Sequence, residues 1–249
     1  MNKINNIWTK IRRKWMKLRL QPIRVYCIHH VSAEYDPQTM WECDWIQLDE
    51  FKWKIMQMKS KGVRFISLPE AHERLKHDWI RFNKFAVLTA DDGFKTILNI
   101  APWLNEQQIP ITLFVNPKYI LEDSMGDNTK HRLEIKGSKA SSRQIYLKPE
   151  DIKKLDLSYI TFAYHGYEHL DEKKIDETAF SQNVQKCKET MLTYFPNVIP
   201  YYAHTFGRTN KGNDEMLLQQ GITPIYVSGT MNYNNVQQID RELLTTKRL

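Results

Sequence analysis

Short runs of apolar residues recur along the chain and predict buried strands. Such runs, without polar alternation, are typical of strands covered on both faces, as in a parallel sheet. The clearest run is Phe85 to Leu88, at the start of the stretch FAVLTADDGF. Together the runs predict strands at 23–28, 63–67, 85–88, 111–115, 159–164, 200–203 and 225–227.

Between these runs, apolar residues recur at steps of three and four and predict helices. Gly62, Pro196 and Gly221 end three of them, because glycine and proline stop helices. Residues 122–149 are mostly polar or small, and we expect a long loop or lid there. The alternation of strands and helices predicts α/β layers or an α/β barrel. The predicted helices span 47–61, 68–76, 96–108, 149–155, 178–195 and 214–220.

The N-terminal segment carries one apolar stripe among basic residues. Residues 1–24 contain eight Lys or Arg and no Asp or Glu. This pattern predicts a basic amphipathic helix at 1–20, followed by one domain at 21–249. The helix can lie on an anionic membrane surface, or it can pack on the domain with its basic face in solvent. Its stripe consists of Ile4, Ile7, Trp8, Ile11, Trp15 and Leu18.

Composition places the chain among ordinary globular proteins, since 41% of its 249 residues are hydrophobic and 26% are charged. The net charge of +7 arises in the N-terminal segment, because the residues after 24 include 28 basic and 29 acidic ones. We therefore expect no nucleic-acid partner for the domain. No signal peptide or transmembrane segment is evident, so we expect a cytoplasmic protein or one peripheral on the cytoplasmic membrane face. Cys27, Cys43 and Cys187 are widely spaced and fit a reducing compartment, with one disulfide as the alternative.

Two adjacent carboxylates, Asp91 and Asp92, follow the predicted strand at 85–88. Adjacent carboxylates repel each other, so two ionised groups need a compensating positive charge, commonly a metal ion. The alternative is a structural one, in which Asp92 and Gly93 form a turn and Asp91 caps a helix.

Histidines follow other predicted strands, at the sheet edge where α/β active sites lie. His165 and His169 are four residues apart, and on one helical turn they would face the same way. With a carboxylate from another strand they could form a two-His, one-Asp site for zinc, iron, cobalt or nickel. Taken alone, the pair also fits packed or surface histidines.

Three motifs carry a family resemblance. TADDG (89–93), HGYEH (165–169) and YAHTFG (202–207) resemble, in order and spacing, the central motifs of the polysaccharide deacetylase family. These proteins are metal-dependent carbohydrate esterases with an irregular (β/α) barrel. The resemblance extends over residues 23–245. The His29-His30-Val31 end of the first strand and GVRFISLPEA (62–71) resemble the branch that acts on N-acetylglucosamine polymers, peptidoglycan and related bacterial glycans.

The resemblance implies a role for each motif residue. Asp92, His165 and His169 would hold a divalent metal, zinc first, with cobalt, nickel or iron as alternatives. Asp91 would be the general base for the attacking water. The backbone N–H of Phe206 would help to stabilise the oxyanion, and His29 and Tyr202 would contact substrate.

Two departures concern the proton that must return to the leaving amine. His204 and Thr205 stand where the family commonly has Tyr and Pro, and no histidine follows His204. One hypothesis makes His204 the general acid, and the other gives it a structural hydrogen bond beside the site.

These expectations describe an N-deacetylase acting on an acetylated amino sugar of a bacterial surface polysaccharide, a lipid-linked glycan or a precursor. An inactive or weakly active glycan-binding relative and an O-deacetylase are the alternatives, since the same scaffold and water chemistry serve both. A basic peripheral protein that binds nucleic acid through residues 1–24 is disfavoured by the near-neutral remainder.

Overall fold

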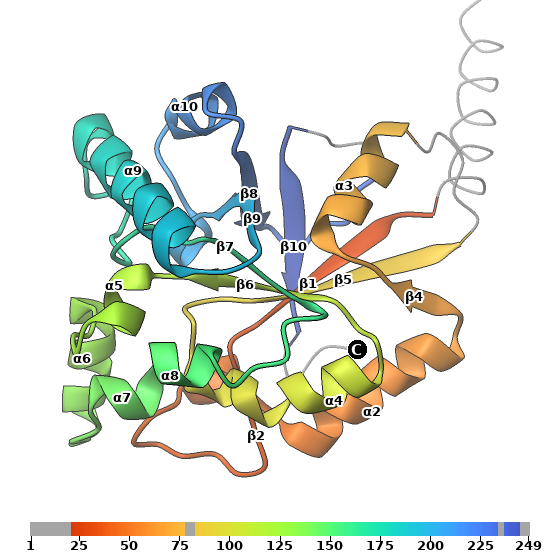
Figure 1. The fold of residues 1–249 in the computed structure, drawn as a ribbon, viewed down its shortest axis with the longest axis horizontal. Coiled ribbons are helices and arrows are strands. Elements are labelled where there is room, and N and C mark those ends of the chain that lie inside the picture. Colours follow the sequence, from red (N-terminus) through yellow and green to blue (C-terminus); the bar gives the residue numbers. More distant parts are fainter. Residues whose placement is uncertain (1–20, 78–82, 234–236, 245–249) are drawn as a thin grey trace, which may run out of the picture.

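Parallel strands close into a barrel in the computed structural model of the protein (Figure 1). The structure describes residues 21–77, 83–233 and 237–244, so the predicted helix at 1–20 lies outside the described residues. Among these residues seven strands form the ring, because β1 pairs with both β5 and β10. In ring order they are β1 (Ile23–Ile28), β5 (Lys84–Ala90), β6 (Ile111–Val115), β7 (Ile160–Tyr164), β8 (Val198–Ala203), β9 (Thr223–Val227) and β10 (Ile239–Leu243). The prediction of an irregular (β/α) barrel is confirmed.

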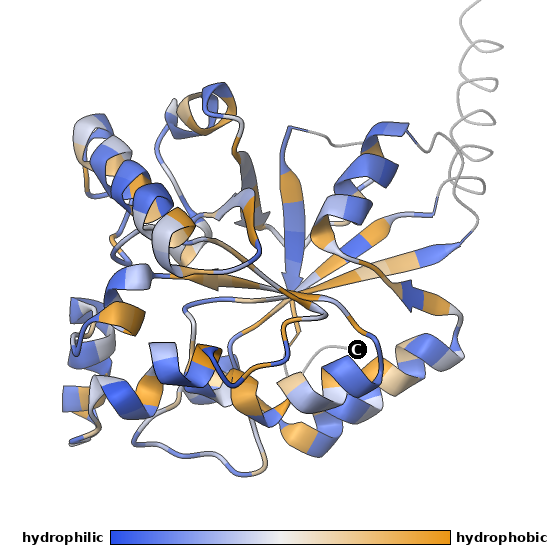
Figure 2. Ribbon diagram, in the orientation of Figure 1, coloured by the Kyte–Doolittle hydropathy of each residue, from blue (hydrophilic) through white to orange (hydrophobic). Residues whose placement is uncertain are grey.

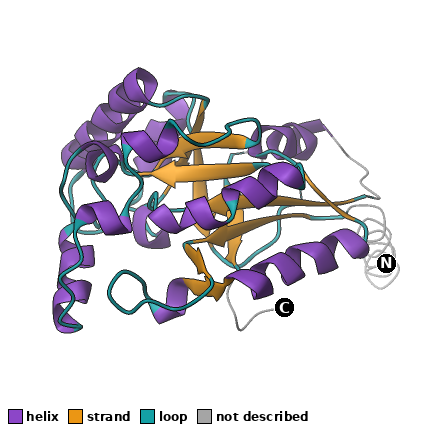
Figure 3. Cartoon of the chain, turned by 60° about the horizontal axis from the view of Figure 1, so that its bottom comes forward, coloured by secondary structure: helices purple, strands orange, loops and turns teal. Residues whose placement is uncertain are grey.

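Three short strands accompany the ring. β4 (Val63–Phe65) pairs in parallel with the start of β5, and β2 (His30–Ser32) pairs with β3 (Trp45–Gln47) in a separate sheet. The helices surround the strands, as the second view shows (Figure 3). They are α2 (Leu48–Ser60), α3 (Leu68–His77), α4 (Ala101–Glu106), α5 (Pro117–Leu121), α6 (Asp127–Ile135), α7 (Ser142–Ile145), α8 (Pro149–Ile152), α9 (Glu177–Tyr194) and α10 (Asn213–Gln219), with 3-10 turns η1 (Glu42–Asp44), η2 (Lys95–Asn99) and η3 (Thr205–Gly207). No helix among them is long and apolar enough to cross a membrane.

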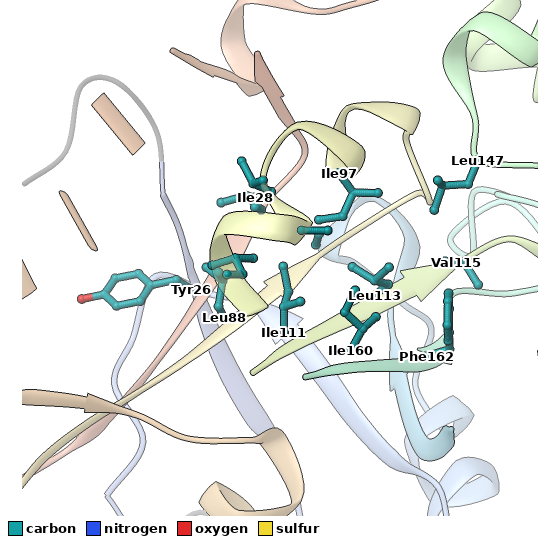
Figure 4. Close-up of a cluster of buried hydrophobic side chains, with 14 of the residues drawn as sticks. Tyr26, Ile28, Leu88, Ile97, Ile111, Leu113, Val115, Leu147, Ile160 and Phe162 are labelled. Carbon is teal, nitrogen blue, oxygen red and sulfur yellow. The ribbon is translucent and has the colours of Figure 1, made fainter. Parts of the chain in front are cut away.

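Both faces of β5 and β6 are buried, which explains their continuous apolar runs. In β5, Phe85 and Val87 belong to one apolar cluster, whereas Ala86 and Leu88 belong to the other. The larger cluster packs strand residues against α2, α4 and α9, and part of it appears in Figure 4. β5 and β6 are accordingly mainly hydrophobic, while the helices carry both hydrophobic and hydrophilic residues (Figure 2).

The predicted loop at 122–149 is wrong, because this segment contains α6 and α7. Its helices bury few apolar residues, so the sequence shows no clear helical spacing of apolar positions. In α6 only Leu133 is buried. The segment is held partly by polar contacts. The buried Lys148 donates through Nζ to the carbonyls of Tyr119 and Glu122, both at 2.7 Å, and to Ser142 Oγ at 2.8 Å.

Other differences are smaller. The helix predicted at 96–108 is divided into η2 and α4, and Pro102 lies at the start of α4, where a missing N–H is tolerated. β2, β3, β10 and α5 were not predicted. All three cysteines are free thiols, so the alternative of a disulfide is wrong.

Candidate metal and catalytic site

The carboxyl ends of the barrel strands open into a pocket of about 290 Å³. This edge is where parallel α/β folds carry their active sites. Of the residues singled out in the sequence, seven line the pocket: His29, Asp91, Asp92, His165, His169, His204 and Phe206. Tyr202 does not, since it is fully buried and donates its hydroxyl to Glu172 Oε1 at 3.2 Å. The expected substrate contact of Tyr202 therefore needs correction, because its polar atom faces the protein interior.

One oxygen of Asp92 lies between the two predicted ligand histidines. Asp92 Oδ1 is 3.2 Å from Nε2 of both His165 and His169. Neither contact has hydrogen-bond geometry, so this buried oxygen has no hydrogen-bond partner. Ligand atoms of one tetrahedral ion, bound at about 2.0–2.2 Å, stand about 3.4 Å apart. The spacing and the unpartnered oxygen therefore fit a divalent metal.

The ring orientation of His165 supports the same fit. Its Nδ1 lies 2.7 Å from the carbonyl oxygen of Ala203, and a carbonyl can only accept. Nδ1 therefore carries the proton, and Nε2 presents its lone pair toward Asp92 and His169 in the neutral ring. A hydrogen bond from the second ring nitrogen is the usual way to orient a histidine ligand.

The histidine pair does not lie on a helical turn, and that prediction is wrong. Residues 165–170 form a bent loop after β7. Gly166 has φ +77°, and Asn183 of α9 holds Glu168 through its backbone N–H (3.0 Å) and carbonyl (3.2 Å). The two rings converge because the loop doubles back, with ring centroids 4.9 Å apart.

Asp91 is bound by a residue that the sequence analysis missed. Arg241 of β10 donates Nη1 to Asp91 Oδ1 at 2.6 Å and Nη2 to Oδ2 at 2.8 Å, and both side chains are buried. Burial alone would raise the pKa of Asp91, but Arg241, with His165, holds that pKa below its usual range. Cys27, His29 and Asp91 also lie close together. They do not suit a second metal, because both Asp91 oxygens already bind a guanidinium.

His204 is enclosed by two further carboxylates that the sequence analysis missed. Its Nδ1 lies 2.7 Å from Glu172 Oε2 and its Nε2 lies 2.9 Å from Asp214 Oδ1. Burial would lower the pKa of His204, but the hydrogen bonds with Asp214 and Glu172 outweigh burial and raise it. The ring has no free nitrogen in this arrangement.

The turn after His204 brings Phe206 to the rim. Phe206 has φ +56°, a left-handed conformation that is uncommon for a non-glycine residue. Its ring meets the ring of His169 edge to face, with centroids 4.5 Å apart. Strained backbone of this kind is often found where a site needs a particular orientation.

Three aromatic residues form an aromatic wall of the same pocket. Trp41, Phe94 and Tyr146 line it, and the buried His30 packs behind, 4.0 Å from Phe94 and 5.3 Å from Trp41 between ring centroids. Tyr146 comes from the segment after α7, which pairs with Phe94 through a backbone bridge. Further polar residues line the pocket, among them Asp44, Asn128, Thr129 and Arg132.

The same chain architecture occurs in solved bacterial proteins. IcaB from Ammonifex degensii superimposes with a TM-score of 0.69 at 20% identity, over 92% of this chain and 94% of that one. The Streptococcus pyogenes deacetylase PplD, solved with acetate, gives a TM-score of 0.72 at 18% identity, over 92% and 94%. A de-N-acetylase from Aggregatibacter actinomycetemcomitans gives 0.69 at 14% identity, over 92% and 97%. At these identities the likeness establishes the fold.

The family follows from the sequence itself. No curated protein sequence matches the chain. The family model described as polysaccharide deacetylase matches residues 82–225, more than half of the chain. That range includes the two aspartates after β5, the histidine loop after β7 and the turn after β8. On this match, the chain belongs to the polysaccharide deacetylase family.

Proposed function

We propose that the protein is a metal-dependent hydrolase that removes an N-acetyl group from an amino sugar. The observation that carries this proposal is the contact of Asp92 with His165 and His169, beside the Asp91–Arg241 pair. One carboxylate has an unpartnered oxygen between two imidazoles, while its neighbour is bound by an arginine. This difference supports separate roles for the two aspartates.

Asp92, His165 and His169 would hold the metal, with Zn²⁺ as the first candidate and cobalt, nickel or iron as alternatives. When bound, such a metal lowers the pKa of water and polarises a carbonyl oxygen. Mixed carboxylate and imidazole ligands, with positions left open, are typical of catalytic sites.

Asp91 would take the proton from the attacking water. Arg241 supports this role in two ways, because it keeps the carboxylate ionised and fixes its orientation at two oxygens. The backbone N–H of Phe206 would donate to the oxyanion that forms from the acetamide carbonyl.

A proton must also return to the leaving amine. His204 could donate it only after one of its ring nitrogens gives up its hydrogen bond to a carboxylate. Both of its nitrogens face carboxylates. This geometry favours the structural hypothesis for His204 over the acid hypothesis. His29 also lines the pocket and keeps its proposed role as a substrate contact.

The substrate would be an acetylated amino sugar within a bacterial surface polysaccharide, a lipid-linked glycan or a precursor. The aromatic wall supports this class, because sugar rings combine apolar faces with hydroxyl groups that suit mixed aromatic and polar linings. Solved relatives named as a deacetylase with acetate and as a de-N-acetylase support the same reaction.

Residues 1–20 would bring the protein to an anionic membrane surface on the cytoplasmic side. The chain without residues 1–20 should then lose sedimentation with anionic vesicles. Equal sedimentation of the two forms would contradict this location.

The reaction is tested by measuring acetate release from matched N-acetylated and O-acetylated sugars and oligosaccharides. We expect release from the N-acetylated set, loss of release after chelation, and recovery with Zn²⁺. Release from O-acetylated substrates alone would identify an O-deacetylase. Sugar binding without release from any substrate would identify an inactive glycan-binding relative.

A further inference from the structure

His204, directly after β8, makes polar contacts through both of its ring nitrogens. Its side chain has no exposed surface. Both ring nitrogens meet carboxylates, Glu172 at 2.7 Å and Asp214 at 2.9 Å. Because a carboxylate accepts, each nitrogen donates, and the ring is therefore held as an imidazolium. A buried cation with two anionic partners is a fixed element rather than a mobile one.

The two carboxylates extend these contacts to neighbouring elements. Glu172 is fully buried, and its Oε1 accepts the backbone N–H of Thr205 at 3.1 Å and the hydroxyl of Tyr202 at 3.2 Å. Asp214 of α10 accepts the hydroxyl of Tyr226 of β9 at 2.5 Å. The network thus ties together β8, β9, α10 and the turn that follows His204.

That turn touches both candidate ligand histidines. On one side of His204, the carbonyl of Ala203 accepts from His165 Nδ1 at 2.7 Å. On the other side, the ring of Phe206 packs against the ring of His169, with centroids 4.5 Å apart. A shift of the turn would therefore change the orientation of both imidazoles.

We propose that His204 is a positioning residue: held between Glu172 and Asp214, it locks the turn at 203–207, and this turn orients His165 and His169. The inference rests on the proposed ligand roles of those two histidines. Groups that orient metal ligands typically change metal affinity by roughly 10–100-fold when they are removed.

The test measures the Kd of Zn²⁺ for the full chain by competition with a chromophoric chelator, together with kcat and the pH–rate profile. His204→Gln can donate to only one of the two carboxylates, and we expect its Kd to rise by roughly 10–100-fold. Asp214→Asn removes one charge of the network, and we expect a smaller rise. Glu215→Gln removes the same charge from the next residue of α10, where the side chain is exposed, and should leave Kd unchanged.

Three results separate the possible roles. An unchanged Kd in His204→Gln, with lower kcat and loss of the basic limb of the pH–rate profile, would make His204 the acid and overturn the proposal. A lower Tm with unchanged Kd and kcat would make it only structural and also overturn it. If His204→Gln does not fold, Asp214→Asn is compared with Glu215→Gln instead, and the same changes in Kd, kcat and Tm decide between the roles. Wild-type Kd in Asp92→Asn would instead contradict the ligand set, and so the proposed function itself.

Discussion

Arg241 binds both carboxylate oxygens of Asp91, at 2.6 and 2.8 Å, across 150 positions of sequence. The pair joins β10 to the end of β5 inside the barrel, where neither side chain is more than 5% exposed. Arg241 Nη1 also donates to Thr89 Oγ1 at 3.2 Å. The same buried pair therefore joins two strands of the barrel and stabilises the ionised form of Asp91.

Replacing Arg241 with Met should lower the free energy of unfolding by about 3–5 kcal/mol, because it leaves the Asp91 carboxylate buried without its partner. The double variant Arg241→Met with Asp91→Asn should lose less, since no buried charge remains. Urea unfolding measures both. Arg24→Met is the control, because the Arg24–Glu242 pair links the neighbouring strands at 3.4 Å but is 43% and 22% exposed, and should cost less than about 1 kcal/mol. Equal effects of the two single variants would contradict the buried pair.

Replacing Gly166 with Ala should disturb the histidine loop. A Cβ at Gly166 would lie 2.6 Å from Asn183 Nδ2 and 2.9 Å from the Glu168 carbonyl, so the loop must move. Gly221→Ala is a matched control, because its φ is also positive, +71°, but a Cβ there meets nothing within 4 Å. Both changes should cost about 1–2 kcal/mol through backbone strain. Only Gly166→Ala should also weaken Zn²⁺ binding. Equal Zn²⁺ affinity of Gly166→Ala and Gly221→Ala would contradict the described geometry of the histidine loop.

His30 should make the protein less stable in acid. Burial, with smaller contributions from His29 and Lys136, lowers the pKa of His30 to about 3, although Asp92 opposes the change. An unfolded histidine titrates near 6.5, so between these values the unfolded chain binds a proton that the folded chain does not. Stability contributed by this site is complete above about pH 6.5 and falls by up to about 1.4 kcal/mol for each pH unit below it.

His30→Phe, which keeps an aromatic ring against Trp41 and Phe94, should remove this part of the pH dependence. Urea unfolding at several pH values between 4 and 6.5 would compare the slopes. The exposed His131→Gln on α6 serves as the control and should keep the wild-type slope. An unchanged slope in His30→Phe would show that His30 is protonated in the folded protein.

His29→Gln should raise KM for an N-acetylated oligosaccharide while kcat and the shape of the pH–rate profile stay near wild type. The reason is that His29 lines the pocket and is not one of the three proposed ligands. Steady-state kinetics across pH provide the measurement. A large loss of kcat with unchanged KM would instead assign His29 to the chemical step.

Much of the barrel could be predicted because its strands are buried on both faces and therefore appear as apolar runs. β10 escaped prediction because its sequence, IDREL, places three charged residues between two apolar ones, and the middle one, Arg241, is buried. A single sequence gives no sign that this arginine meets an aspartate 150 positions away.

The candidate metal ligands were recognisable from TADDG and HGYEH, but the two carboxylates that contact His204 were not. Glu172 lies within LDEKKIDE, which is typical of a solvated charged segment, yet it is fully buried against His204. Asp214 lies in the first turn of α10, where an acidic residue is favourable for helix stability alone. Their contacts depend on the tertiary fold and could not be inferred from spacing.

The central claim is that the two adjacent aspartates have different roles. Asp92 holds the metal, and Asp91 takes the proton from the attacking water. The most direct measurement compares Zn²⁺ affinity and acetate release in Asp91→Asn and Asp92→Asn. We expect Asp91→Asn to bind Zn²⁺ near wild-type affinity but to release acetate at least about 100-fold more slowly. We expect Asp92→Asn to lose both Zn²⁺ binding and acetate release. Tight Zn²⁺ binding by Asp92→Asn, or substantial acetate release by Asp91→Asn, would contradict the account.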